Sequence, residues 1–87
     1  MYEVEITPEG LRHLDRLPGT VRAAALETIL GPIAENPARL GRPPVGELEG
    51  LYSARRGDYR VIYEIDADAR VVVVLRVQHW RDVDRPR

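Results

Sequence analysis

The chain has 87 residues, no cysteine and a formal net charge of −1, with 44% hydrophobic and 31% charged residues. This length allows one hydrophobic core, so we expect residues 1–87 to form a single domain, and the composition excludes an intrinsically disordered chain. The absence of cysteine excludes disulfides and thiolate metal sites, and the near-neutral charge gives no general electrostatic reason to predict nucleic-acid binding.

The first two elements are predicted by alternation and by a capping pattern. Residues 2–6 alternate between apolar and charged side chains, which predicts a half-buried edge strand whose inward residues are Tyr2, Val4 and Ile6. Thr7, Pro8 and Glu9 provide an N-cap, a proline for the first helical position and an acid in the first turn. A helix therefore begins here and ends at Pro18-Gly19, and its apolar stripe is Leu11, Leu14 and Leu17.

A second helix is predicted from near Thr20. Its apolar residues recur at spacings of three and four, as in a helix packed on a sheet: Val21, Ala25, Leu26, Ile29, Leu30 and Ile33. We expect a kink or a break at Gly31-Pro32, because proline removes a backbone hydrogen bond and clashes with the preceding turn. The helical region ends at Asn36-Pro37, and a loop is predicted from Pro37 to Gly50.

Three strands are predicted in the C-terminal part of the chain. Runs of β-branched and aromatic residues at Leu51–Arg55, Tyr59–Asp66 and Val71–His79 are separated by short polar turns, which is typical of two successive hairpins. The last run is apolar on both faces, so we expect it to be central in the sheet. The order β-α-α-β-β-β predicts an α+β fold of two layers, an antiparallel β-sheet with two helices packed on one face.

Charge and hydropathy suggest where the chain acts. Residues 51–87 contain eight arginines and six acids, whereas residues 1–50 contain five arginines and eight acids, so the basic residues concentrate in the C-terminal part. No apolar run approaches the roughly 20 residues of a membrane span, and residues 1–5 lack a signal-peptide profile. We expect a cytoplasmic protein with no membrane partner.

Two segments carry a resemblance to a known family. The first is the string Leu48-x-Gly50-Leu51-Tyr52-Ser53-x-Arg55-Arg56-x-x-Tyr59-Arg60-Val61-x-Tyr63. The second is the last strand with its tail, Leu75-Arg76-Val77-Gln78-His79-Trp80-Arg81-Asp82-Val83, which is similar to a V-G-H-R-R-x-V/I-Y ending. With the element order, they make nearly the whole chain resemble the RelE/ParE superfamily of type II toxin–antitoxin toxins, which includes a YoeB-like branch, and RelE most of all.

The resemblance implies a function and its alternatives. RelE-like members cut messenger RNA in the ribosomal decoding site, whereas ParE-like members poison DNA gyrase. For this chain it implies a ribosome-dependent mRNA endonuclease that inhibits translation without metal or cofactor. A ParE-like gyrase inhibitor and a catalytically inactive antitoxin-binding module are the alternatives. The implied partners are a RelB-like antitoxin, the ribosome with its mRNA, and operator DNA bound through the antitoxin.

RNA cleavage by the ribose 2′-hydroxyl requires a base, an acid and cations that hold the developing charge at phosphorus. Arginine suits the third role because its planar fork matches phosphate, but its pKa above about 12 makes it a poor proton carrier. The resemblance assigns Arg60 to the scissile phosphate. Strand alternation places Arg60, Ile62 and Glu64 on one face, so a structural ion pair with Glu64 or with an acid on the next strand is the alternative role.

The strand before Arg60 contributes further candidates. Arg55 falls where RelE-like enzymes have basic residues and Arg56 flanks it at the turn, so both are predicted to bind RNA. Simple solvation of a turn residue is the alternative for Arg56. Ser53 stands where some relatives carry lysine or arginine, and we expect the missing positive charge to weaken catalysis.

The end of the last strand completes the predicted site. The resemblance makes Arg81 a phosphate-binding residue and His79 a catalytic group, since histidine titrates near neutral pH. Alternation groups His79 with Val73, Leu75 and Val77, which leaves a buried structural histidine as the alternative. Trp80 is predicted to stack on an unpaired base or to cap the core edge. Arg76 points opposite to His79 and is predicted to bind RNA on the face of Arg60.

Two positions depart from the family pattern. The tyrosine that RelE-like enzymes place near the C-terminus aligns with Asp84, and the glutamate of YoeB-like enzymes aligns with Pro44. An aspartate with the ordinary pKa of about 3.9 is a weak base at neutral pH. The proton carrier is therefore His79 or Asp84. If neither residue transfers the proton, the protein is a slow nuclease or not a nuclease. His13, in the first helix, is expected to have no chemical role.

Overall fold

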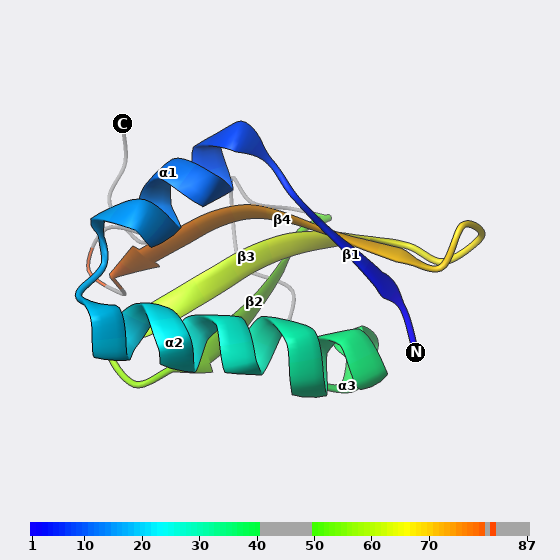
Figure 1. Cartoon of the computed structure of the whole chain (residues 1–87). Coiled ribbons are helices and arrows are strands. Elements are labelled where there is room, and N and C mark those ends of the chain that lie inside the picture. The colour runs from blue at the N-terminus through cyan, green and yellow to red at the C-terminus, as the bar shows by residue number, and fades with distance from the viewer. Residues whose placement is uncertain (41–49, 80, 82–87) are drawn as a thin grey trace.

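The computed structural model describes residues 1–40, 50–79 and 81. Its elements in chain order are β1 (Glu3–Ile6), α1 (Pro8–Arg16), α2 (Gly19–Thr28), the π-helical turn η1 (Ile29–Ile33), α3 (Pro37–Leu40), β2 (Tyr52–Arg56), β3 (Tyr59–Asp66) and β4 (Val71–His79). The strands form one sheet in the order β1-β4-β3-β2, and α2 lies across one of its faces (Figure 1). The predicted α+β fold with helices on one face of a sheet is confirmed.

The direction of β1 corrects one expectation. Strands β2, β3 and β4 form the predicted antiparallel meander, and β4 is central as expected. β1 is an edge strand, but it pairs with β4 in parallel, from Glu3 opposite Val71 to Ile6 opposite Val74, so the sheet is mixed. Alternation along β1 predicts which side chains face inward, whereas its partner and direction depend on how the helices carry the chain back across the sheet.

The start of α1 is built as its sequence predicts. Thr7 is the N-cap, and its hydroxyl oxygen accepts a hydrogen bond from the backbone N–H of Gly10 at 3.0 Å. The same hydroxyl donates to the carbonyl of Leu75 at 3.1 Å, so α1 is attached to β4 where β1 ends. Only part of the predicted stripe faces the core, because Leu14 is buried and Leu17 half-buried while Leu11 is exposed.

The second helical region continues through its proline. Between Ile29 and Ile33 the backbone forms a π-helical turn around Pro32, so α-helical geometry is interrupted at the expected place, and the wider turn accommodates a residue without an N–H donor. Ile29 and Ile33 are fully buried, whereas Leu30, predicted for the same stripe, is exposed. Residues 37–40, predicted as loop, form the short helix α3, and the Pro37 carbonyl accepts a 2.7 Å hydrogen bond from the Tyr63 hydroxyl.

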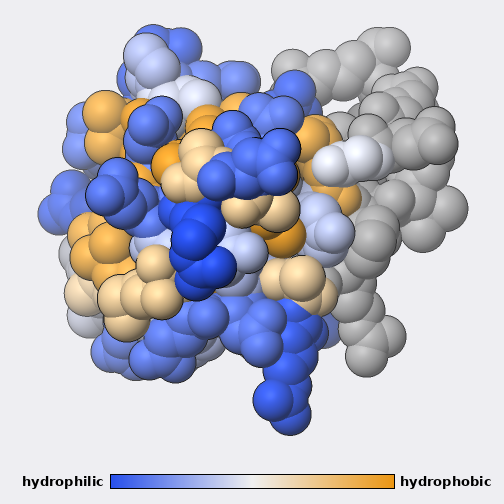
Figure 2. All heavy atoms as spheres, turned by 90° about the vertical axis from the view of Figure 1, so that its right-hand side faces the viewer, coloured by the Kyte–Doolittle hydropathy of each residue, from blue (hydrophilic) through white to orange (hydrophobic). Residues whose placement is uncertain are grey.

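The core lies between the helices and one face of the sheet. Its buried members include Leu14, Ala25, Ile29 and Ile33 from the helices and Ala54, Val61, Tyr63, Val72, Val74 and Val77 from the strands. Figure 2 shows that the end of the molecule with the N-terminus and the β3–β4 turn is mainly hydrophilic, with small separate hydrophobic areas. Among the described residues, no helix is long and apolar enough to cross a membrane.

Candidate functional site

Strand register divides the sheet residues between two faces. Paired residues of antiparallel strands point to the same side of the sheet. The pairs that contain core residues define the helix-covered face, and the remaining pairs define the opposite face, which we call the distal face. On β2, β3 and β4 the polar and charged residues of the distal face are Ser53, Arg55, Arg60, Glu64, Asp66, Arg76 and Gln78, and at the β1 edge Glu3 and Glu5 face the same side. Arg55, Arg60 and Gln78 lie in one row across β2, β3 and β4, because Arg60 is the register partner of both others.

Arg55 and Arg60 are adjacent cations held by neutral oxygens. The Arg60 guanidinium donates to the Ser53 hydroxyl at 3.2 Å, and Arg55 donates through Nε to the carbonyl of Gly57 at 2.9 Å. Within residues 1–40, 50–79 and 81, neither arginine forms an ion pair, so the proposed Arg60–Glu64 pair is not formed there. Two neighbouring guanidinium groups that form no ion pair with residues 1–40, 50–79 or 81 are suited to bind a phosphate oxygen pair.

Arg76 shares this face but has an acidic neighbour. Its register partner is Ile62, which places it on the side of Arg60 as expected. Its Nε lies 3.8 Å from a carboxylate oxygen of Glu9 in α1, and both side chains are partly exposed. The carboxylate reduces the positive potential at this end of the face, and solvent limits the strength of the pair.

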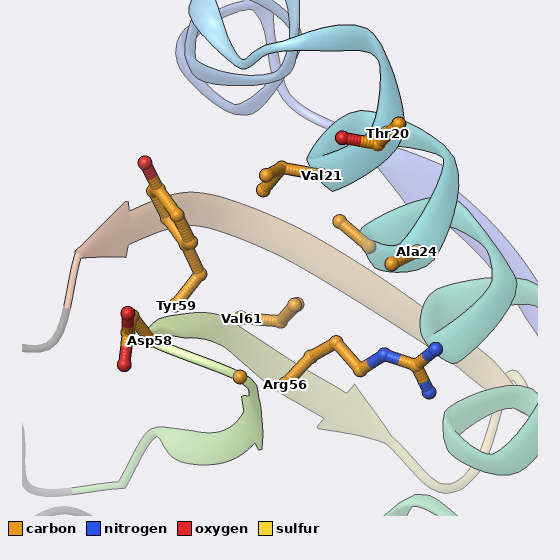
Figure 3. A pocket seen from close by; sticks show the side chains of 9 residues that line it. Thr20, Val21, Ala24, Arg56, Asp58, Tyr59 and Val61 are labelled. Carbon is orange, nitrogen blue, oxygen red and sulfur yellow. The ribbon is translucent and has the colours of Figure 1, made fainter.

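Arg56 lies on the other side of the sheet. It pairs in register with Tyr59, a residue of the helix-covered face, and its guanidinium lies 3.6 Å from a carboxylate oxygen of Glu27 in α2. A pocket of about 240 Å³ lies beside it between α2 and the β2–β3 turn, and Figure 3 shows Val21, Ala24 and Val61 around it while Arg56 extends toward α2. The structure therefore does not bring Arg56 together with Arg55 and Arg60.

A β-bulge changes the position predicted for His79. The register between β3 and β4 shifts at Leu75, since Ile62 is opposite Arg76 and Tyr63 is opposite Val74. One extra residue reverses the alternation, so His79 shares its face with Val77, Val74 and Val72, and the predicted grouping with Val73 and Leu75 is wrong. His79 thus lies on the helix-covered face, across the sheet from Arg60.

His79 contacts an aromatic ring and a backbone amide. Its ring meets the ring of Tyr59 edge-on, with 5.5 Å between centroids, and its Nδ1 accepts a hydrogen bond from the backbone N–H of Arg81 at 3.3 Å. Arg81 is exposed immediately beyond β4. The other predicted residues, Trp80, Asp84 and Pro44, lie outside the described part of the chain.

His13 has a structural function that sequence reasoning missed. Its Nδ1 accepts a hydrogen bond from the backbone N–H of Val77 at 3.1 Å, on the stretch of β4 beyond β1. Its Nε2 lies 3.9 Å from Glu9. Burial lowers the pKa of His13 below its usual 6.5, with Glu9 opposing this effect. No local pattern could have indicated the contact, because the two residues are 64 positions apart.

The described residues contain no group of three histidines or acids close enough to hold a metal ion. The row of Arg55, Arg60 and Gln78 on the distal face, with the Ser53 hydroxyl beside it, supplies cations and neutral polar groups that can bind and polarise phosphate, and the acids of the face lie outside this row. His79, the histidine of the C-terminal part, is on the opposite side of the sheet.

Known proteins resemble this chain in sequence and in structure. Residues 4–83 match the family described as the ParE toxin of the type II toxin–antitoxin system parDE. Toxin RelE of Mycobacterium tuberculosis is 49% identical over 76 residues, which are 87% of this chain and 78% of that protein. Toxin RelG of the same organism is 43% identical over 84 residues, 97% of each chain. The crystal structure of the M. tuberculosis toxin–antitoxin complex RelBE2 contains a chain that is 44% identical with a TM-score of 0.85, and the match covers 90% of this chain and 96% of that one.

Proposed function

We propose that the chain cuts messenger RNA on the ribosome. It belongs to the ParE toxin family of type II toxin–antitoxin systems, and its relatives named RelE and RelG support this activity. The observation that carries the proposal is the row of Arg55 and Arg60, two neighbouring cations with no acidic partner among the described residues. Such a pair fits the phosphodiester backbone of a single strand. The site of action would be the cytoplasm, where ribosomes and messages are.

The proposed reaction is metal-independent. The ribose 2′-oxygen attacks the adjacent phosphorus and the bond to the 5′-oxygen breaks, so a base removes one proton and an acid returns one to the leaving oxygen. Arg60 holds the non-bridging phosphate oxygens, whose charge grows in the transition state, and Arg81 adds a second cation at the end of β4. Arg55 and Arg76 bind flanking phosphates of the distal face. Arg56 and Trp80 remain predicted RNA contacts, and Arg56 contributes less than Arg55 because it pairs with Glu27 on the helix-covered side.

Proton transfer is assigned to His79. It is the last residue of β4 and follows Gln78, the register partner of Arg60, so it is one residue along the chain from the cation row. A message that crosses the end of the sheet would contact Arg60 on the distal face and His79 at the end of β4 on the helix-covered face. This arrangement separates charge stabilisation from proton transfer, and it predicts a slow enzyme.

Cleavage mapping in a reconstituted translation system tests the proposal. We expect the wild type to stop translation and to cut messages within the ribosome, and Arg60→Ala to lower the cleavage rate about 100-fold or more, as for loss of a group that binds transition-state charge. The matched control is Arg39→Ala, which removes an exposed arginine on α3 and should cut like wild type. Continued translation with no cuts in the wild-type reaction would refute the proposal.

One observation favours a second function. Because His79 faces away from Arg60, the distal face has no histidine beside its cations among the described residues, and inhibition of DNA gyrase needs no proton carrier. A supercoiling assay with a molar excess of the toxin separates the two functions. If the toxin neither cuts messages nor inhibits supercoiling, and Arg60→Ala is as harmless to growth as wild type, the chain acts as an inactive antitoxin-binding module.

We also propose a RelB-like antitoxin as the partner. The basis is the 44% identical toxin chain, which was solved as part of the RelBE2 toxin–antitoxin complex. An acidic segment of the antitoxin over Arg55 and Arg60 would block phosphate binding, and the complex would reach operator DNA through the antitoxin. Co-expression with the product of a neighbouring short reading frame, where that product is acidic and amphipathic, followed by size-exclusion chromatography, tests this pairing.

A further inference from the structure

The register of β2 and β3 creates an electrostatic conflict. Arg55 and Arg60 are direct partners on the distal face, and like charges opposite each other on neighbouring antiparallel strands repel. Neither has an acidic partner within the described residues. Hydrogen bonds to neutral oxygens are another means of holding two such guanidinium groups in a defined geometry.

Two hydrogen bonds direct the arginines apart. Arg55 donates to the carbonyl of Gly57, which lies in the β2–β3 turn. Arg60 donates to the hydroxyl of Ser53, whose register partner is Ile62, so Ser53 lies two residues farther from the turn than the Arg55–Arg60 pair. The two side chains thus lean in opposite directions along the hairpin.

The Ser53 hydroxyl is suited to hold the guanidinium. Ser53 is only 8% exposed, so water competes little for its hydroxyl oxygen. This oxygen accepts the hydrogen bond from the Arg60 guanidinium at 3.2 Å. A bond from a charged donor is stronger than one between neutral groups. Lysine or arginine at this position has no acceptor and could not receive this bond. The hydroxyl therefore adds a function that a cation would not supply.

We propose that Ser53 is a positioning residue that orients the Arg60 guanidinium for the scissile phosphate. The proposal rests on the proposed nuclease function for its consequence in catalysis, but the orientation of Arg60 is a property of the free toxin. It also replaces the expectation that serine at this position only removes a positive charge.

Arginine side-chain NMR on the free toxin tests the orientation without any activity. In wild type we expect slow rotation of the Arg60 guanidinium about its Nε–Cζ bond. Ser53→Ala should speed this rotation to that of exposed Arg39, and Ser53→Thr should restore it, because threonine keeps the hydroxyl and suits a strand. Arg55 is the internal control and should not change. Unchanged Arg60 rotation in Ser53→Ala would overturn the proposal.

Cleavage kinetics test the consequence. We expect Ser53→Ala to lower kcat about tenfold with little change in KM, as for a catalytic group held in a less productive geometry, and Ser53→Thr to restore it. In an Arg60→Ala background, Ser53→Ala should cause no further loss of kcat. If Ser53→Ala acted through a general effect on folding, its loss would instead add to the loss caused by Arg60→Ala. Additive losses, or no loss in the single variant, would overturn the positioning role. A wild type that restricts Arg60 but cuts no RNA would refute only the nuclease function.

Discussion

At the scale of single residues, the chemistry of this chain depends on which oxygen or nitrogen each polar side chain meets. Arg60 donates to a hydroxyl, and Arg56 pairs with the carboxylate of Glu27 on the helix-covered side of the sheet. His13 accepts from a backbone amide. Both Arg60 and Arg56 are guanidinium cations, but among the residues that the structure describes only Arg56 has a carboxylate partner, which reduces its attraction for phosphate. The contacts therefore rank the basic residues in a way that composition does not.

Arg55 and Arg56 are adjacent in sequence but should differ in effect. Arg55→Ala removes a cation of the distal face and should raise KM for the message about fivefold or more, as loss of a charged hydrogen bond does. Arg56→Ala removes an exposed ion pair with Glu27 from the other side and should change KM little. Steady-state cleavage kinetics of the two variants measure the difference. A larger effect of Arg56→Ala would show that RNA crosses the helix-covered side.

His13 should make folding stability depend on pH. Because burial lowers its pKa below 6.5 in the folded protein, the unfolded chain binds the proton more tightly. The stabilisation is therefore complete above pH 6.5 and is lost as pH falls from there toward the lowered value. Glu9, Arg12 and Arg16 of α1 and Arg76 of β4 are the charged groups around it.

Urea unfolding at about pH 7.5 and about pH 5.5 measures this effect. Wild type should lose stability between the two values. His13→Asn should lose less, because its amide oxygen can accept the Val77 N–H and does not titrate. Equal losses in the two proteins would assign the pH dependence to other groups.

At the scale of elements, close packing of α1 on the sheet depends on Gly10. A Cβ atom built there would lie 3.0 Å from Cγ2 of Ile6 and 3.1 Å from the carbonyl oxygen of Val74. The backbone oxygen cannot move without distorting β4, so helix and strand approach this closely only because the residue is glycine. The Thr7 cap fixes the same end of the helix to Leu75.

Gly10→Ala should destabilise the fold. Overpacking costs about 1–3 kcal/mol, which exceeds the gain of up to about 1 kcal/mol from the higher helix propensity of alanine. Gly19→Ala is the control, since a Cβ atom there meets nothing within 4 Å, and it should be neutral or slightly stabilising. Thermal and urea unfolding compare the two. A Gly10→Ala protein as stable as wild type would show that α1 can move away from β4.

At the scale of the whole molecule, the sheet connects segments that are far apart in sequence. β1 and β4 join residues 3–6 to residues 71–74, and Tyr63 at the centre of the sheet reaches α3 through its hydroxyl. The bond from Tyr63 to the Pro37 carbonyl is buried and 2.7 Å long. It holds the end of the helical layer against the strand that carries Arg60.

Tyr63→Phe should therefore weaken the connection between the two layers. The Pro37 carbonyl would lose a buried donor, at a cost of about 1–3 kcal/mol. Tyr52→Phe is the control, because Tyr52 stacks on Tyr63 at 5.8 Å but its hydroxyl makes no hydrogen bond within the described residues. Urea unfolding should show a lower midpoint for Tyr63→Phe alone. Equal midpoints would mean that the hydroxyl contributes nothing to the packing of α3.

The resemblance to the RelE/ParE superfamily pointed to Arg60, whereas the amino-acid pattern by itself determined the types of the main elements, the Thr7 cap, the antiparallel meander and the central position of β4. These features depend on residues a few positions apart, through periodicity, capping and turn chemistry. Only the tertiary structure decided the parallel partner of β1, the π-helical turn at Pro32, the bulge at Leu75 and the contacts of Arg60 and His13. A bulge or a pairing depends on packing between segments that meet only in the fold, and one inserted residue sufficed to place His79 and Arg60 on opposite faces.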